Sequence, residues 1–126
     1  MKKLTLVALL LLSSVAHAQS TPAKKELVAR ILVLQQPAIE QTAQALVERP
    51  AMQMQQQAIL ALQARVAPEK RKAAAKNIQA DLKKYVDDVG PGARQQAVKL
   101  APTTIGTLLE EKFTEDELKQ LIAIIE

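Results

Sequence analysis

Helical periodicity runs through almost the whole chain, and it narrows the available folds more than any other feature. Apolar residues recur three or four positions apart over long stretches, whereas runs of β-branched residues are scarce. The 126 residues include only three glycines, and the good helix formers Ala, Gln, Leu and Lys are abundant. The sequence therefore predicts an all-α protein, an irregular bundle of five or six antiparallel amphipathic helices with short loops marked by Pro or Gly.

The prolines supply most of the expected helix boundaries. A first helix is expected from Ala23 to Gln36, because Pro37 pushes the residue before it out of the α region. Pro37, Pro50 and Pro68 stand where a second, third and fourth helix can begin, since Pro is well tolerated in the first turn. The fourth helix carries the most regular apolar stripe, formed by Ile78, Leu82, Tyr85, Val86 and Val89.

Further boundaries are expected in the second half of the chain. The triplet Gly90-Pro91-Gly92 predicts a turn that ends the fourth helix. A fifth helix is expected from about Ala93 to Lys112, with a kink or a split at Pro102. Thr114, followed three residues later by Glu117, forms a capping-box pattern that predicts the start of a sixth helix.

The first eighteen residues have the composition of a secretory signal peptide. Met1-Lys2-Lys3 is a short basic start, and Leu4 to Val15 is an almost unbroken apolar run. Ala16 and Ala18 place small residues at positions −3 and −1 of a cleavage site before Gln19. The run is too short to span a bilayer comfortably as an anchor, and no Cys follows it to carry a lipid. We therefore expect export to the periplasm of a Gram-negative cell, or secretion from any other.

Removal of residues 1–18 leaves a single helical domain, residues 19–126, with little catalytic chemistry. This span of 108 residues suits one domain. The only His, His17, lies in the predicted signal peptide, Ser20 is the only Ser that remains, and Cys and Trp are absent. Nucleophilic triads and zinc sites of His and thiolate ligands are therefore excluded. We expect a protein that is not an enzyme and that has no cofactor and no metal site.

Residues 109–122 read Leu-Glu-Glu-Lys-Phe-Thr-Glu-Asp-Glu-Leu-Lys-Gln-Leu-Ile, and Phe113 is expected to close onto Leu118 as a hydrophobic staple. This stretch resembles the signature of the bacterial domain of unknown function 2059 family, and a weaker match extends back to about Lys83. The core of the match is Phe113, Thr114, Glu117 and Leu118. The resemblance implies an exported protein of amphipathic helices, and it brings no activity, cofactor or catalytic residue. Family members continue beyond this helix, so the resemblance also implies a domain that is incomplete after Glu126.

A basic segment in the expected fourth helix is the candidate contact surface. Residues 65–84 contain seven basic and two acidic residues, a net charge of +5. Lys72, Lys76 and Lys83 share one helical face, which we place opposite the apolar stripe. Such a face can attract anionic lipid headgroups or an acidic partner, or it can be the solvated side of an amphipathic helix. Nucleic acid is not expected, because the mature chain has a net charge of only +2 and lacks interleaved aromatic residues.

Other polar groups have simpler explanations than catalysis or metal binding. Acidic residues surround the turn into the last expected helix, where the helix dipole favours negative charge. They are Glu110, Glu111, Glu115, Asp116 and Glu117. Met52 and Met54 would lie about 200° apart on a helix, so they cannot hold copper together. Asp87-Asp88 lacks the alternating oxygen ligands of a calcium loop.

Three classes of function are open to such a chain. The first is a noncatalytic exported module that binds an unknown protein partner or assembles as a homo-oligomer. Ala51, Ala58 and Ala61 would permit close helix approach either within the fold or between subunits. The second is an envelope chaperone that shields apolar segments, although residues 113–117 do not reproduce the Leu-Thr-x-x-Gln motif of one such group. The third is a hydrolase that uses carboxylates alone.

Overall fold

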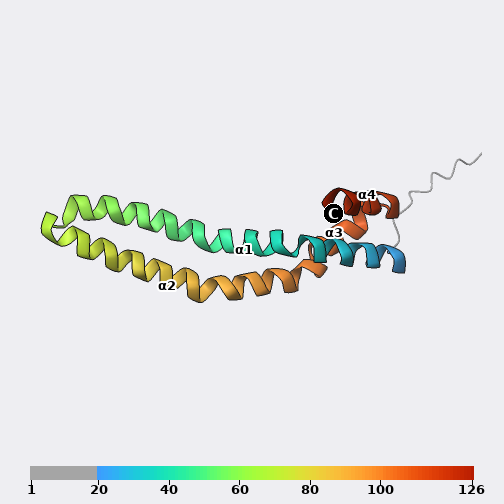
Figure 1. The fold of residues 1–126 in the computed structure, drawn as a ribbon, viewed down its shortest axis with the longest axis horizontal. Helices are drawn as coiled ribbons and strands as arrows, with labels where there is room; N and C mark the ends of the chain where they lie inside the picture. Colours follow the sequence, from blue (N-terminus) through green and yellow to red (C-terminus); the bar gives the residue numbers. More distant parts are fainter. Residues whose placement is uncertain (1–19) are drawn as a thin grey trace, which may run out of the picture.

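The structure, a computed structural model, describes residues 20–126, which form helices and no strand. The elements are α1 (Pro22–Arg65), α2 (Pro68–Leu100), the 3₁₀ turn η1 (Ala101–Thr103), α3 (Ile105–Lys112) and α4 (Glu115–Ile125). Figure 1 shows α1 and α2 as a long antiparallel hairpin, with α3 and α4 folded back onto the first turns of α1. The prediction of an all-α fold is confirmed. The prediction of five or six helices in an irregular bundle is not confirmed, because α1 joins the first three expected helices and α2 joins the fourth to the first part of the fifth.

Two of the expected proline boundaries do not exist, because α1 runs through both Pro37 and Pro50. A proline inside a helix removes one backbone hydrogen bond and costs about 3 kcal/mol, but it leaves the residues on both sides free to stay helical. α1 packs along much of its length against α2 and also against α3 and α4, and this packing keeps the helix continuous. Figure 1 shows only a gentle bend in the middle of α1.

The expected turn at Gly90-Pro91-Gly92 is also absent, since all three residues lie inside α2. No glycine among the described residues has a positive φ, so none of them serves a left-handed turn. Gly90 is instead the one buried residue of α2, and an added Cβ there would lie 2.6 Å from Oε1 of Gln44. Gly90 therefore permits a close approach of α2 to α1, a role that the sequence pattern did not reveal.

The remaining predicted boundaries are confirmed. Pro68 is in the first turn of α2, directly after the short connection at Val66 and Ala67. α2 ends at Leu100, and Pro102 lies in the 3₁₀ turn that separates it from α3. Both hydrogen bonds of the capping box between Thr114 and Glu117 are present at the start of α4.

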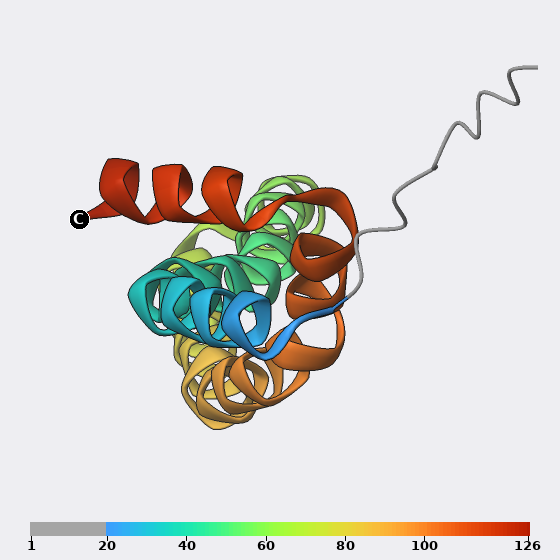
Figure 2. The same ribbon diagram turned by 90° about the vertical axis from the view of Figure 1, so that its right-hand side faces the viewer.

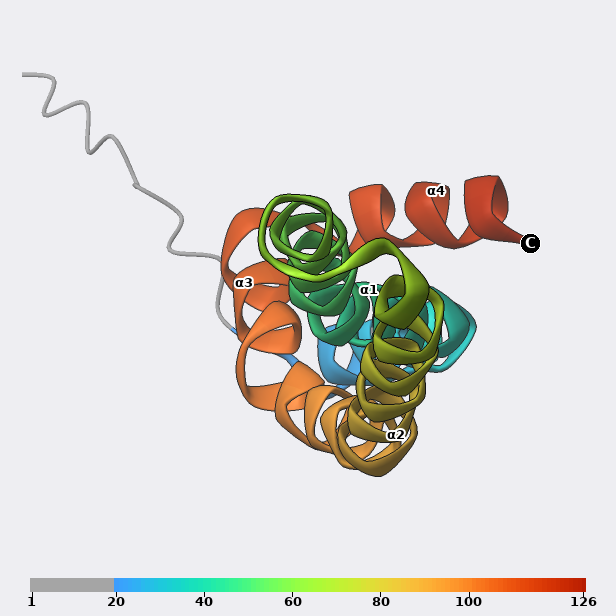
Figure 3. The same cartoon turned by 90° about the vertical axis from the view of Figure 1, so that its left-hand side faces the viewer.

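The packing divides the molecule into three parts. We call residues 20–36 and 101–126 the base, and residues 52–89 the arm. The base holds a cluster of buried side chains from α1 and α4: Val28, Ile31, Leu118 and Ile122. Between base and arm, close contact of the two long helices buries Ala43, Val47 and Ala51 of α1, and Gly90 of α2. Views along the long axis show α3 and α4 beside the hairpin at the base and α4 running across its axis (Figures 2 and 3).

Candidate functional site

The four residues that carry the family resemblance stabilise the base. Leu118 is fully buried in the core cluster, and Phe113 packs against that cluster, as expected for a hydrophobic staple. The backbone N–H of Thr114 donates to Oε2 of Glu117 at 2.8 Å, and the N–H of Glu117 donates to Oγ1 of Thr114 at 3.3 Å. These residues therefore fix the start of α4 and dock it on α1.

The acidic residues of the turn hold the ends of the described chain together. Oγ1 of Thr21 donates to Oε1 of Glu115 at 2.6 Å, and the hydroxyl of Ser20 donates to Glu110. Arg30 of α1 forms an ion pair with Glu126. These acidic residues were expected only to suit the dipole of α4. They also connect the beginning of α1 to α3 and α4.

The electrostatics of Glu117 differ from those of a catalytic acid. Its hydrogen bonds with the backbone and then the side chain of Thr114 lower its pKa, and the charge of nearby Lys24 acts in the same direction. Lys24 is itself buried, at 2% exposure, and is the one buried charged residue in the region from 20 to 126. A general acid for hydrolysis needs a raised pKa, whereas the pKa of Glu117 is lowered.

The candidate basic face is exposed, but its position differs from the prediction. Lys72 and Lys83 border shallow grooves between α1 and α2, so this face lies beside the apolar stripe and not opposite it. Lys76 is also exposed on α2. Lys83 forms an ion pair with Asp87, which leaves Lys72 and Lys76 as the stronger candidates for an external anion.

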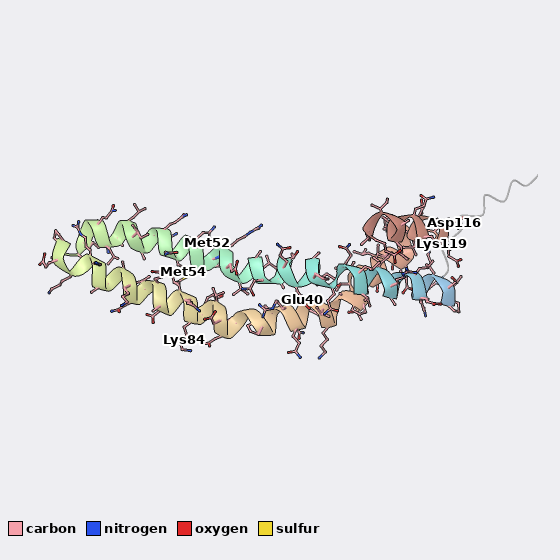
Figure 4. All side chains as sticks on the ribbon, in the orientation of Figure 1. Glu40, Met52, Met54, Lys84, Asp116 and Lys119 are labelled. Carbon is pink, nitrogen blue, oxygen red and sulfur yellow. The ribbon has the colours of Figure 1, made fainter. Side chains whose placement is uncertain are left out.

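Two other basic residues of the segment have internal roles. Arg71 donates from Nε to the carbonyl of Val66 at 2.7 Å and from a terminal nitrogen to that of Gln63 at 2.9 Å. These bonds satisfy carbonyl groups at the end of α1. Lys84 forms an ion pair with Asp88, and this hydrogen bond and charge raise the pKa of Lys84. Figure 4 shows Lys84 on the outer side of α2.

The exposed apolar surface of the arm was not predicted from the sequence. No residue from 52 to 89 is buried, although the arm contains the most regular apolar stripe of the sequence. The large apolar side chains of the arm that are at least 40% exposed are Met52, Met54, Ile59, Leu60, Tyr85 and Val89. The signal was present in the composition, because small Ala and polar Gln occupy many of the positions where α1 faces α2.

Met52 and Met54 lie in the arm portion of α1, as Figure 4 shows, and both side chains are more than half exposed. Within residues 20–126, no group of three or more His, Cys, Asp or Glu side chains is arranged to hold a metal ion. The same part of the chain contains no helix that is both long and apolar enough to cross a bilayer. The predicted cleavage residues, Ala16, Ala18 and Gln19, lie outside the described residues.

An open apolar groove lies at the junction of base and hairpin. It has a volume of about 290 Å³, and most of its lining is aliphatic, from α1, α2 and η1. Leu32, Val33 and Val98 form part of its wall, while Lys25 and Glu110 stand among its polar residues. Val33 is 70% exposed, so the base presents apolar surface of its own in addition to that of the arm.

In comparisons with known proteins, no family model, no curated protein and no solved structure matches this chain.

Proposed function

We propose that this protein is an exported, noncatalytic helical module that binds a protein partner or assembles with itself through the arm of its hairpin. The observation that carries this proposal is the absence of any buried residue between positions 52 and 89, where large apolar side chains stay exposed. The proposal places function on a surface of the arm and leaves the base as the support that holds α1 and α2 together.

The physical argument concerns how much a pair of helices can cover. An amphipathic helix has an apolar stripe about 100° wide or more, and one neighbouring helix covers only part of it. Met52 and Ile59 of α1 remain 53% and 44% exposed, and Tyr85 of α2 remains 42% exposed. Exposed apolar surface of this extent is typical of sites that bind another protein. A third and a fourth helix packed on the grooves beside Met52 and Ile59 would bury these two side chains.

Export belongs to the same proposal. Residues 1–18 direct the chain to the periplasm of a Gram-negative cell, or out of any other, and are removed before Gln19. We also retain kinship with the domain of unknown function 2059 family as a proposal, supported by the roles of Phe113 and Leu118 in the base. Lys72 and Lys76, with Lys83 beside them, are proposed to draw the arm towards anionic lipid headgroups or an acidic partner.

A chaperone is the second candidate, and the same exposed arm favours it. A surface rich in Met and small residues adapts to different apolar segments, because Met is flexible and polarisable. Purified mature protein in excess should then suppress the aggregation of a reduced, unfolding test protein. If an excess of the protein failed to suppress aggregation, the chaperone function would be excluded and the specific binding module would remain.

Site-specific photo-cross-linking in exporting cells tests the main proposal. A photoreactive amino acid at Met52 or Ile59 should give discrete covalent adducts, because these side chains line the grooves between α1 and α2. The matched control is Lys84, on the outer side of α2 (Figure 4). Adducts at twice the mass of the chain would indicate self-assembly, and other masses a different protein. Equal yields at all three positions, or none at Met52 and Ile59, would contradict the proposal.

A further inference from the structure

We propose that the partner of the arm is a second copy of this chain, packed antiparallel so that the tip of each hairpin lies against the base of the other. This inference rests on the proposed function, because it names the partner of the same surface. We define the tip as residues 59–76, the far end of the arm from the base (Figure 1).

Charge is distributed unevenly along the molecule. The tip contains five basic residues and one acidic residue, a net charge of +4. The described base contains five basic and seven acidic residues, a net charge of −2, and within it residues 105–126 alone carry −4. The stretches between them, residues 37–58 and 77–100, contain five residues of each sign. Each molecule is therefore a rod with a basic end, a neutral middle and an acidic end.

The charged groups at both ends remain available to a partner. Lys72 and Lys76 are exposed, and the ion pairs found within residues 20–126 do not include them. At the base, Glu110 and Glu115 accept hydrogen bonds from neutral hydroxyl groups, which leaves their negative charge in place. Glu111 is exposed on α3. An antiparallel neighbour would place opposite charges together at both ends of the pair.

The same arrangement covers the apolar surface of the arm. Two antiparallel hairpins side by side form a four-helix arrangement, in which the arm of each copy lies against the base of the other. The base offers the apolar groove beside Leu32, Val33 and Val98 as a surface for that arm. A two-fold axis through the neutral middle closes the pair, because the same surface is used by both copies. A parallel pair would cover similar apolar side chains but would bring two tips of +4 together, so charge decides the direction of packing.

Sedimentation equilibrium of the mature chain, with inverted charge variants, tests the association. The tip variant Lys70→Glu/Lys72→Glu/Lys76→Glu changes the tip from +4 to −2 and should raise the Kd of the dimer tenfold or more. Lys70 lies in the first turn of α2, where a negative charge is favourable, and Lys72 and Lys76 are exposed, so this variant should fold. Adding Glu111→Lys/Asp116→Lys to the tip variant changes the net charge of the base from −2 to +2. The two ends then again carry opposite charges, which should restore association.

A single-substitution pair controls for net charge. Lys76→Glu at the tip and Arg49→Glu in the neutral middle change the charge of the chain by the same amount. Only Lys76→Glu should weaken the dimer measurably. Equal weakening by both would show that net charge alone matters and would overturn the antiparallel arrangement.

Spin-label distances test the direction independently of charge. The chain contains no Cys, so a single introduced cysteine can be labelled without background. α2 has 33 residues and is about 50 Å long. Labels on Ala67→Cys should therefore lie roughly that far apart in the antiparallel dimer, whereas mixed labels on Ala67→Cys and Glu111→Cys should lie close together. A short distance between two tip labels would overturn the proposal.

A chain that stays monomeric at every concentration would also overturn the dimer. The proposed binding module would survive that result if photoreactive Met52 or Ile59 still formed adducts with a different protein. Monomeric protein with no arm-specific adduct would contradict both. The two experiments together therefore separate failure of the dimer from failure of the proposed function.

Discussion

The base and the arm share α1, yet they bury their apolar side chains to very different extents. In the base, α1 is covered on separate sides by α3 and α4, and Leu118 reaches complete burial. In the arm, α1 has only α2 beside it, and Met52, Ile59 and Tyr85 stay about half exposed. The difference teaches that similar amphipathic patterns give a closed core only where more than two helices meet. Burial is therefore concentrated in the base, although Val33, Leu108 and Ile124 there also stay more than half exposed, whereas no residue of the arm is buried.

Leu118→Ala should have the largest effect, because it removes the one large side chain in residues 20–126 that is fully buried. We expect a loss of about 2 to 5 kcal/mol in the free energy of unfolding, from lost burial and a residual cavity. Urea denaturation followed by circular dichroism measures it. The arm variant Ile59→Ala should cost at most about 1 kcal/mol, because half of that side chain is already exposed. Equal losses would remove the contrast between base and arm.

Leu82→Asp tests how much the apolar stripe of α2 contributes. Leu82 is partly buried and lines a groove together with Ala51 and Val86. A charge there should cost about 1 to 2 kcal/mol, less than in a closed core, because water reaches the carboxylate. The exposed control Lys76→Glu should change stability by about 0.5 kcal/mol or less. Thermal melts of both variants at equal protein concentration measure these changes in stability. If Leu82→Asp lost as much stability as Leu118→Ala, the arm would have a closed core like that of the base.

Gly92→Ala distinguishes a continuous α2 from a turn. No atom lies within 4 Å of an added Cβ at Gly92, and its φ is negative, so Ala should stabilise α2 by about 0.5 to 1 kcal/mol. Gly90→Ala should gain less or destabilise, because its Cβ must displace the side chain of Gln44. Denaturation midpoints of the two variants give the comparison. A destabilised Gly92→Ala variant would favour the turn that the sequence pattern suggested.

The smallest expected effect concerns pH and the start of α4. The pKa of Glu117 is lowered in the folded base, so its contribution to stability is present above the pKa of the unfolded chain. That contribution should be lost as pH falls through the lower pKa of the folded state. Glu117→Gln should therefore reduce the loss of stability on acidification. Melting temperatures of both proteins across the acidic range measure this, and parallel curves would show that the capping box does not contribute.

Short-range signals in the sequence determined the helical class and several boundaries. Thr114 and Glu117 predicted the start of α4, because a capping box acts within a single turn. Pro68 predicted the start of α2, and Pro102 predicted its separation from α3. The candidate lysines were also recognisable as exposed from their helical spacing. All these features depend on neighbours within a few residues, which a single sequence displays.

Only the tertiary structure decided which prolines and glycines interrupt a helix and which apolar side chains become buried. Pro37 and Pro50 stay inside α1 because packing against other helices offsets the lost hydrogen bonds, and that packing involves residues far away in the chain. Gly90 serves close contact with Gln44 in place of a turn for the same reason. Lys72 and Lys83 lie beside the apolar stripe because the position of α1 defines where the seam runs. The number of helices meeting at a given point cannot be read from local periodicity, and it separates the closed base from the open arm.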